Sequence, residues 1–144
     1  ETDARGYAFE SFLRCWFDVW GLEARKSFRI GNGEQIDGSF VHRHSVFLLE
    51  AKWKNAETNA GELHSFQGKV GERLEGARGL YVSYAGFTSP SLRDFTAKRI
   101  LLMDGMDIVD ALTRQLSLDE IIAAKLRIAI EERRPFVRVR ELFP

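Results

Sequence analysis

The stretch EQIDGSFVHRHSVFLLEAKWK, from Glu34 to Lys54, decides how the fold of this chain is interpreted. Its apolar run Val46-Phe47-Leu48-Leu49 is typical of a β-strand that is covered on both faces. That run leads directly into Glu50-Ala51-Lys52, so the strand ends in charged side chains. Such an ending needs a physical reason, and the elements on either side of the strand suggest one.

Hydrophobic periodicity predicts the order of helices and strands along the chain. Apolar residues at three- and four-residue spacing indicate helices, while alternation and short apolar runs indicate strands. The pattern predicts a helix over residues 9–20, strands over 22–30, 35–41 and 46–53, a helix over 59–74, a strand over 79–85, a helix over 89–99, a strand over 100–103, and helices over 106–114 and 117–134.

This order defines an α/β fold with a mixed central sheet of about five strands, flanked by helices. The first three strands form an antiparallel meander, with a tight turn at residues 31–33, and helix-linked strands extend it. Gly21 ends the first helix, and Pro135 stops the last. The glycines of the helix over 59–74 favour close packing or close approach of a ligand; they are Gly61, Gly68 and Gly71.

The hairpin within the opening stretch brings acidic side chains together. If the chain turns about Arg43-His44, Phe40 pairs with Phe47, and the same register places Asp37 opposite Glu50. Directly opposed residues share one face of the sheet, with β-carbons about 4.5–5.5 Å apart. Strand alternation puts Lys52 on the same face as Glu50. Two carboxylates and one amine are therefore predicted to cluster near one end of the sheet.

Two carboxylates that face each other repel, and a hard divalent cation such as Mg²⁺ relieves that repulsion. Asp37 and Glu50 are the predicted metal ligands. A metal of this kind lowers the pKa of a bound water and neutralises charge on a phosphoryl transition state, and Lys52 can orient that water. The set suits phosphodiester hydrolysis. The alternative is structural, because a Glu-x-Lys pair on a strand is often an ordinary ion pair.

Bulk composition limits the class of protein. The chain has 144 residues, 44% of them hydrophobic, which fits one globular domain over residues 1–144. Lys plus Arg and Asp plus Glu both number 21, so nucleic-acid binding would need a local basic face. The one cysteine, Cys15, allows no internal disulfide, and no apolar run is long enough for a membrane span. We expect a cytoplasmic protein, and a domain excised from a longer chain.

Several motifs, in order, resemble the PD-(D/E)XK nuclease superfamily, and more closely its Mrr-type restriction endonuclease branch. The similarity runs from about Gly6 to Leu112. The matching pieces are Gly6-Tyr7-Ala8-Phe9-Glu10, Ile36-Asp37-Gly38, Phe47-Leu48-Leu49-Glu50-Ala51-Lys52-Trp53, Phe66-Gln67-Gly68, the segment GLYVSYAGFT at residues 79–88 and the segment ILLMDG at residues 100–105.

The resemblance implies a restriction-endonuclease-like fold and Mg²⁺-dependent cleavage of DNA, with Mn²⁺ able to substitute and a role in restriction or defence against foreign DNA. It also implies that Asp37, Glu50 and Lys52 are the catalytic set, with lesser roles for Glu10 and Gln67. Mrr-type sequences often carry Gln in place of Glu50, so this chain has the more acidic version. Cleavage of two strands suggests a homodimer, or other domains of the parent protein as partners.

The secondary residues each have a structural alternative. Glu10 is a further carboxylate or the partner of Arg14 in a helix-surface ion pair. Gln67 contacts the site or is a half-buried amide. Residues Thr88 and Ser89 bind a phosphate or only cap a helix. Lys54, Lys69 and Arg73 are candidates for a basic track along DNA, or ordinary surface charges. The three histidines lack the spacing of a zinc site.

Two other functions compete with DNA cleavage. One is a module that keeps the nuclease fold without activity and binds DNA or a protein. The intact set of Asp37, Glu50 and Lys52 argues against this alternative, because an inactive site has no reason to keep all three residues. The other is a nuclease that acts on RNA. Nothing in the sequence reads a 2′-hydroxyl, so competition between RNA and DNA substrates would settle the choice.

Overall fold

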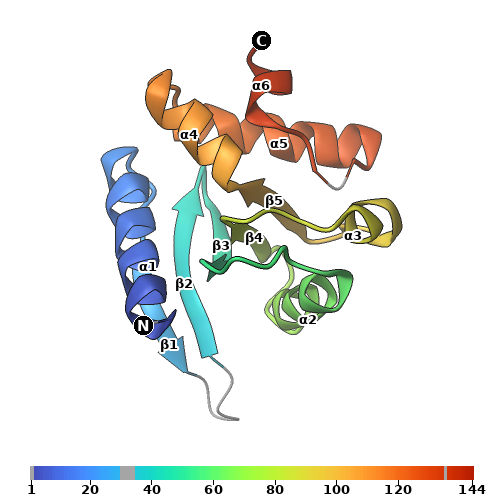
Figure 1. Ribbon diagram of the computed structural model, residues 1–144, viewed down its shortest axis with the longest axis horizontal. Coiled ribbons are helices and arrows are strands. Elements are labelled where there is room, and N and C mark those ends of the chain that lie inside the picture. Colours follow the sequence, from blue (N-terminus) through green and yellow to red (C-terminus); the bar gives the residue numbers. More distant parts are fainter. Residues whose placement is uncertain (1, 30–34, 135) are drawn as a thin grey trace.

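The structure, a computed structural model, describes residues 2–29, 35–134 and 136–144 (Figure 1). Five strands form one sheet in the order β1-β2-β3-β4-β5. The strands are β1 (Arg25–Arg29), β2 (Gln35–His42), β3 (Ser45–Lys52), β4 (Arg78–Ser83) and β5 (Ile100–Asp104). The helices are α1 (Thr2–Val19), α2 (Ala60–Gly71), α3 (Ser89–Asp94), α4 (Gly105–Thr113), α5 (Leu118–Glu132) and α6 (Val139–Leu142).

The hairpin of β2 and β3 has the predicted turn and register. His42 pairs with Ser45, and Phe40 pairs with Phe47. Between them Arg43 has φ 47° and His44 has φ 72°, so both turn residues are left-handed. This backbone is that of a two-residue hairpin turn whose twist matches the flanking strands. The predicted turn at Arg43-His44 is therefore confirmed.

The sheet is mixed, as predicted, and β3 is the strand where its character changes. β1 and β2, and β2 and β3, are antiparallel, whereas β3, β4 and β5 run parallel. Helices link the parallel strands, because such strands need a crossover connection. All five residues of β5 are buried, and Ile100 to Met103 form the continuous apolar run expected of a strand covered on both faces.

Helices cover both faces of the sheet, and each face has its own core (Figure 1). One core joins α1, α4 and α5 to Phe40, Phe47 and Leu49. The other joins α2 to Leu48, Tyr81 and further residues of the sheet. The alternation along β3 thus sends successive side chains to opposite cores. This arrangement leaves the C-terminal end of β3 held on both faces.

Helix α2 approaches the sheet closely at Gly79. A β-carbon at Gly79 would lie 2.8 Å from both Phe66 and Val70 and 2.9 Å from Ile100. Only glycine fits in this space. In contrast, a β-carbon at Gly68 would meet no heavy atom within 4 Å among the described residues. At Gly71 a β-carbon would lie 3.3 Å from Nε of Arg99, so close packing is made by Gly71 of the helix and, more tightly, by Gly79 of the strand.

The predicted boundaries differ from the structure at several helices. Helix α1 begins at Thr2 rather than near residue 9, and helix α2 ends at Gly71 rather than near residue 74. Helix α3 ends at Asp94, because Phe95 is already extended with ψ 128°. Helix α5 ends at Glu132, and Arg133 adopts the left-handed conformation with φ 57°. Helix α6 was not predicted. The predicted turn at residues 31–33 and the predicted stop at Pro135 lie outside the described residues.

A buried ion pair anchors the C-terminal segment. Lys125 Nζ lies 3.0 Å from Asp107 Oδ2 and donates to the carbonyl oxygen of Val137 at 2.6 Å. The other oxygen of Asp107 accepts the backbone N–H of Val139 at 2.8 Å. Both charged side chains are almost fully buried, at 3% and 0% exposed. Burial raises the pKa of Asp107 and lowers that of Lys125, so each charge depends on the other.

No helix among the described residues is both long and apolar enough to cross a bilayer.

Candidate active site

Glu50 lies near the C-terminal end of β3, in the middle of the sheet. It is 8% exposed, its backbone pairs with Tyr81 of β4, and the preceding Leu49 pairs with Gly38 of β2. Lys52 Nζ lies 3.3 Å from Glu50 Oε2, and Lys69 Nζ lies 3.9 Å from Glu50 Oε1. Lys52 shares the face of Glu50 because the two residues are one alternation apart. Lys69 reaches the same carboxylate from α2.

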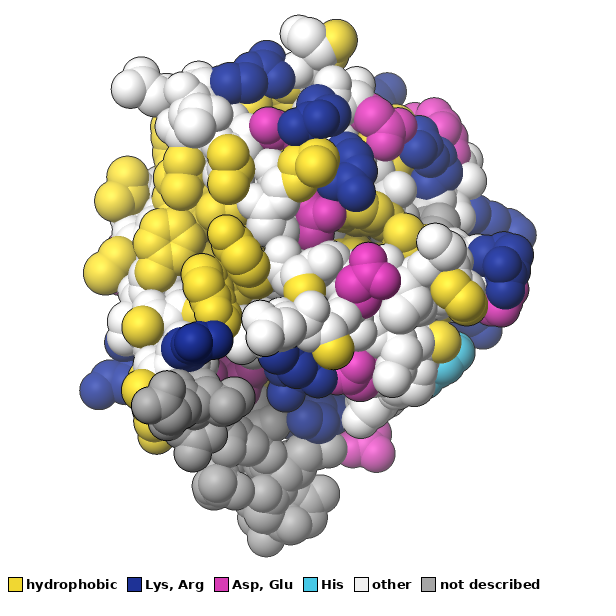
Figure 2. Space-filling model, in the orientation of Figure 1, with side chains coloured by type: hydrophobic (Ala, Val, Ile, Leu, Met, Phe, Trp, Pro, Cys, Tyr) yellow, Lys and Arg dark blue, Asp and Glu magenta, His cyan; other side chains and the backbone are white. Residues whose placement is uncertain are grey.

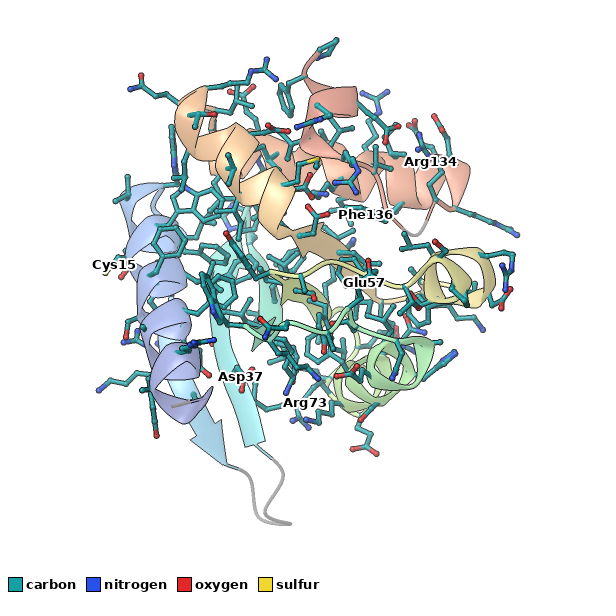
Figure 3. All side chains as sticks on the ribbon, viewed as in Figure 1. Cys15, Asp37, Glu57, Arg73, Arg134 and Phe136 are labelled. Carbon is teal, nitrogen blue, oxygen red and sulfur yellow. The ribbon has the colours of Figure 1, made fainter. Side chains whose placement is uncertain are left out.

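Asp37 lies on β2 where the antiparallel ladder ends. The last backbone pair in the ladder is Gly38 with Leu49. One step further, Asp37 Oδ2 accepts the backbone N–H of Ala51 at 2.9 Å. The side chain thus takes the place of a ladder partner beside Glu50. Figure 3 shows Asp37 on β2, in the region between α1 and α2. The register that places Asp37 across from Glu50 continues the observed ladder.

The charge of Asp37 disfavours the charged form of Glu50. Burial raises the pKa of Glu50, and the charge of Asp37 raises it further, while Lys52 and Lys69 lower it. For Lys52, burial acts to lower the pKa, but the charge of Glu50 and their hydrogen bond outweigh it, so the pKa of Lys52 is raised. Lys52 is therefore an ammonium at neutral pH, and acts by charge and by donating hydrogen bonds.

Glu10 extends this acidic cluster from α1. Burial raises its pKa from 4.5 to about 7, and the charges of Asp37 and Glu50 also raise it. The charges of Arg14 and Lys52 lower it. Glu10 thus feels the charges of Arg14 and of the carboxylates of the sheet, and its role at the site stays a prediction.

A cavity of about 390 Å³ opens beside Glu50, between β3, β4 and α2. Tyr81 forms part of its wall, pairs with Glu50 in the parallel ladder and is 1% exposed. Burial raises the pKa of its phenol, which therefore stays protonated. Tyr81 was missed by the sequence reasoning, although its place in the predicted strand over 79–85 was a usable signal. The lining residues are Glu50, Lys52, Asn59, Gly61, Glu62, Ser65, Phe66, Lys69 and Tyr81.

The donor set fits a hard divalent cation in part. Asp37 and Glu50 supply carboxylate oxygens, which Mg²⁺ prefers, and their mutual repulsion is what a cation would relieve. Over the described ranges 2–29, 35–134 and 136–144, no three His, Cys, Asp or Glu side chains converge into a complete ligand group. Mg²⁺ commonly keeps waters or phosphate oxygens in its shell, so two protein carboxylates match its usual binding.

Gln67 does not join this cluster. Its Oε1 accepts the backbone N–H groups of Lys98 at 2.7 Å and Arg99 at 3.1 Å, and its Nε2 donates to Thr96 at 3.2 Å. The amide thus fixes the segment before β5 and lies outside the lining of the Glu50 cavity. These bonds to backbone groups support the structural alternative for Gln67, and a contact with the site stays a prediction.

The residues predicted to contact DNA lie in different parts of the structure, and Lys69 lies beside Glu50. Lys69 reaches Glu50, whereas the exposed Lys54 pairs with Glu62 at 2.8 Å. The side chain of Thr88 accepts the backbone N–H of Ser91 and caps α3, and Ser89 is exposed in the first turn. The predicted capping role is therefore confirmed for Thr88, whereas Ser89 is the first residue of the helix and not its cap. Arg73 follows α2 and is half-buried (Figure 3). Contact of any of these residues with DNA stays a prediction.

The comparisons with known proteins support the fold. No family model and no curated protein matches the chain. Among solved structures, the chain is similar to the MspJI restriction endonuclease in complex with a 27-mer oligonucleotide, with a TM-score of 0.51 and 16% sequence identity. The match covers 97% of this chain but only 36% of that protein. The fold is thus α/β and restriction-endonuclease-like, while the Mrr-type branch stays a prediction.

Proposed function

We propose that the chain is a metal-dependent endodeoxyribonuclease domain that hydrolyses DNA phosphodiester bonds. The observation that carries the proposal is the convergence of Asp37, Glu50 and Lys52 at the end of β3, in a fold of the restriction-endonuclease type. Glu50 is buried, and both its burial and the charge of Asp37 disfavour its charged form, which Lys52 and Lys69 favour. An acidic residue kept at such a position suggests a functional use of its charge.

Asp37 and Glu50 are the residues that would hold Mg²⁺ or Mn²⁺, with Glu10 near enough to feel both charges. A bound metal of this kind would acidify a water molecule and neutralise charge on the transferred phosphoryl group. The free oxygen of Asp37 matters here, because its other oxygen is engaged by the backbone of Ala51.

Lys52 is the residue proposed to act on the attacking water. Its ammonium holds a hydrogen-bond acceptor in place and stabilises negative charge that develops beside it. The 3.3 Å contact with Glu50 keeps the amine over the same end of the strand. Lys69, which approaches the other oxygen of Glu50, adds a second positive charge for a phosphate.

DNA is proposed as the substrate by fold analogy, since the similar MspJI structure was solved with an oligonucleotide. The chain corresponds to 36% of that protein, so selection of a target sequence is assigned to parts outside this domain. A role in restriction or defence, and assembly as a homodimer, belong to the same proposal.

Supercoiled plasmid DNA provides the test. Wild-type protein with Mg²⁺ should nick and linearise it, EDTA should stop the reaction, and Lys52→Met should lower the rate at least about 100-fold, as expected for a group that stabilises transition-state charge. Arg93→Met is the matched control, because Arg93 pairs with its neighbour Asp94 on α3 and is 69% exposed.

Equal nicking by wild type and Lys52→Met would refute the assignment of Lys52. DNA binding without cleavage, unaffected by Glu50→Gln, would favour the inactive binding module. The alternative of an RNA nuclease is tested by adding a competing RNA of the same sequence. Faster cleavage of the RNA than of the DNA would make RNA the substrate.

A further inference from the structure

A second cavity, of about 730 Å³, lies in a groove between α1 and α4. Phe9 and Ile108 are buried in it, while Phe12, Tyr84, Val109 and Leu112 are 38–49% exposed. Figure 2 shows hydrophobic side chains gathered over α1 and α4 on the left of the molecule. A cavity of this volume with apolar walls is typical of a site for a flat organic group.

Three aromatic rings form one end of the groove. The rings of Trp53 and Tyr84 are stacked, with centroids 4.1 Å apart and an interplanar angle of 21°. Phe9 meets Trp53 edge-on at 5.1 Å and 61°. We call these residues, Phe9, Trp53 and Tyr84, the aromatic platform. Edge-on packing from Phe9 fixes the indole, so the platform is ordered before a ligand arrives.

The aromatic platform is fixed to the backbone of the candidate active site. Trp53 directly follows Lys52, and the backbone N–H of Tyr84 donates to the carbonyl oxygen of Lys52 at 3.0 Å. Strand alternation sends Lys52 to one face and Trp53 to the other. Lys52 and the platform therefore lie at the same end of β3 on opposite faces, so a polymer must pass over this end of the strand to meet both.

The charges at the groove select the kind of ligand. Arg5 and Lys54 are the charged residues in its lining, and none of the described lining residues is acidic. Positive charge beside exposed aromatic rings suits an anionic chain that carries flat bases, since the bases stack and the phosphates face the cations. Lys54 is paired with Glu62 at 2.8 Å, so it is held near this position.

We propose that the groove binds an unstacked nucleobase of the nucleic-acid strand whose phosphate backbone lies at Lys52. This inference rests on the proposed function, because it takes nucleic acid as the ligand. The groove is nevertheless a different site from the carboxylate cluster, and it binds a base by stacking rather than a phosphate. The platform stacks on the base without reading its hydrogen-bonding edge, so the groove tolerates every base.

The test measures affinity without cleavage. Protein carrying Lys52→Met is mixed in EDTA with a fluorescent single-stranded dT oligonucleotide, or with an abasic strand that has the same number of phosphates, and anisotropy is recorded. Adding Trp53→Leu or Tyr84→Leu should weaken binding of dT about 5- to 100-fold and change binding of the abasic strand less than about 2-fold. Trp53→Phe, which keeps a ring, should retain most of the affinity.

Equal losses for both strands, or no loss for either, would overturn the base site. Since Trp53 packs on Phe9, thermal unfolding of each variant is compared, and Tyr84→Leu supplies a variant at a more exposed position. Dimerisation that Leu112→Asp abolishes, with dT binding unchanged in Trp53→Leu, would instead assign the groove to a second copy of the chain. Absence of Mg²⁺-dependent nicking by wild type refutes only the proposed nuclease activity, because this binding assay needs no cleavage.

Discussion

Asp37 Oδ2 accepts the backbone N–H of Ala51 at 2.9 Å, so one carboxylate oxygen completes the end of the β2–β3 ladder. The other oxygen is the one proposed to serve the site beside Glu50. A single side chain thus has a structural and a proposed chemical role, and the two can be separated. An amide keeps an acceptor for Ala51 but removes the charge that a metal would need.

Asp37→Asn should leave the free energy of unfolding within about 1 kcal/mol of wild type while abolishing metal-dependent cleavage. Asp37→Ala should abolish cleavage as well, and should lower stability by about 1–3 kcal/mol, because the N–H of Ala51 is then unsatisfied. Urea unfolding and plasmid nicking measure the two effects. Retained cleavage in Asp37→Asn would remove Asp37 from the metal site.

Glu10 should make stability depend on pH. Its pKa is about 7 in the folded state and 4.5 as the ordinary value, so folding favours its protonated form. Its contribution to stability is full below pH 4.5 and is lost as pH rises through 7. Glu10→Gln should therefore raise the Tm at pH 8 relative to wild type, with the difference vanishing near pH 4.5. Thermal unfolding at both pH values checks this, and a constant difference would contradict it.

Gln67 should behave as a structural residue. Gln67→Leu leaves the N–H groups of Lys98 and Arg99 without their acceptor, and should lower the free energy of unfolding by about 1–3 kcal/mol. Gln67→Glu keeps that acceptor but loses the Nε2 donor to Thr96, so it should destabilise less than Gln67→Leu. At a temperature where both variants are folded, nicking rates should equal the wild-type rate, whereas a large loss of rate in Gln67→Glu would restore a role at the site.

The buried pair of Lys125 and Asp107 should be sensitive to removal of one partner. Lys125→Met leaves the Asp107 carboxylate buried without its cation, which should cost about 3–5 kcal/mol of stability. Arg127→Met on the same helix removes an exposed pair with Glu131 and should change stability by about 0.5 kcal/mol or less. Denaturant unfolding compares the two, and similar small effects would contradict the structural role of the buried pair.

Two residues with left-handed backbone, His44 in the hairpin turn and Gly21 after α1, should respond to substitution in opposite directions. His44 has φ 72°, which L-residues adopt only with strain, so His44→Gly should stabilise the protein by about 1 kcal/mol. Gly21 has φ 74° at the end of α1, and Gly21→Ala should destabilise by a similar amount, although space for the methyl group is open. Thermal unfolding of both variants should show shifts of opposite sign.

The sequence alone predicted the sheet and the relation of Asp37 to Glu50, because both depend on local patterns. A two-residue turn fixes the hairpin register, and alternation then determines which residues share a face. The same local reasoning placed Lys52 beside Glu50 correctly.

Contacts between distant segments were not predictable in this way. The bonds of Gln67 reach residues about thirty positions away, and the aromatic platform joins α1 to the segments after β3 and β4. Helix α6 was missed because it has four residues, too few to show a periodicity. The tertiary bond of Asp107 to Val139, rather than local propensity, holds its start in place.

The change from antiparallel to parallel pairing at β3 also bears on the order of folding. Asp37 and Ala51 are 14 residues apart, and a tight turn joins their strands, whereas β4 pairs with β3 only after a helical crossover. Short loops close with less entropy loss, and hairpins form in about 1–10 μs. We expect the two carboxylates to meet before Lys69 of α2 reaches them. In the early hairpin of β2 and β3, the carboxylates of Asp37 and Glu50 would then repel each other without a nearby cation. Mg²⁺ present during refolding should therefore speed formation of this hairpin.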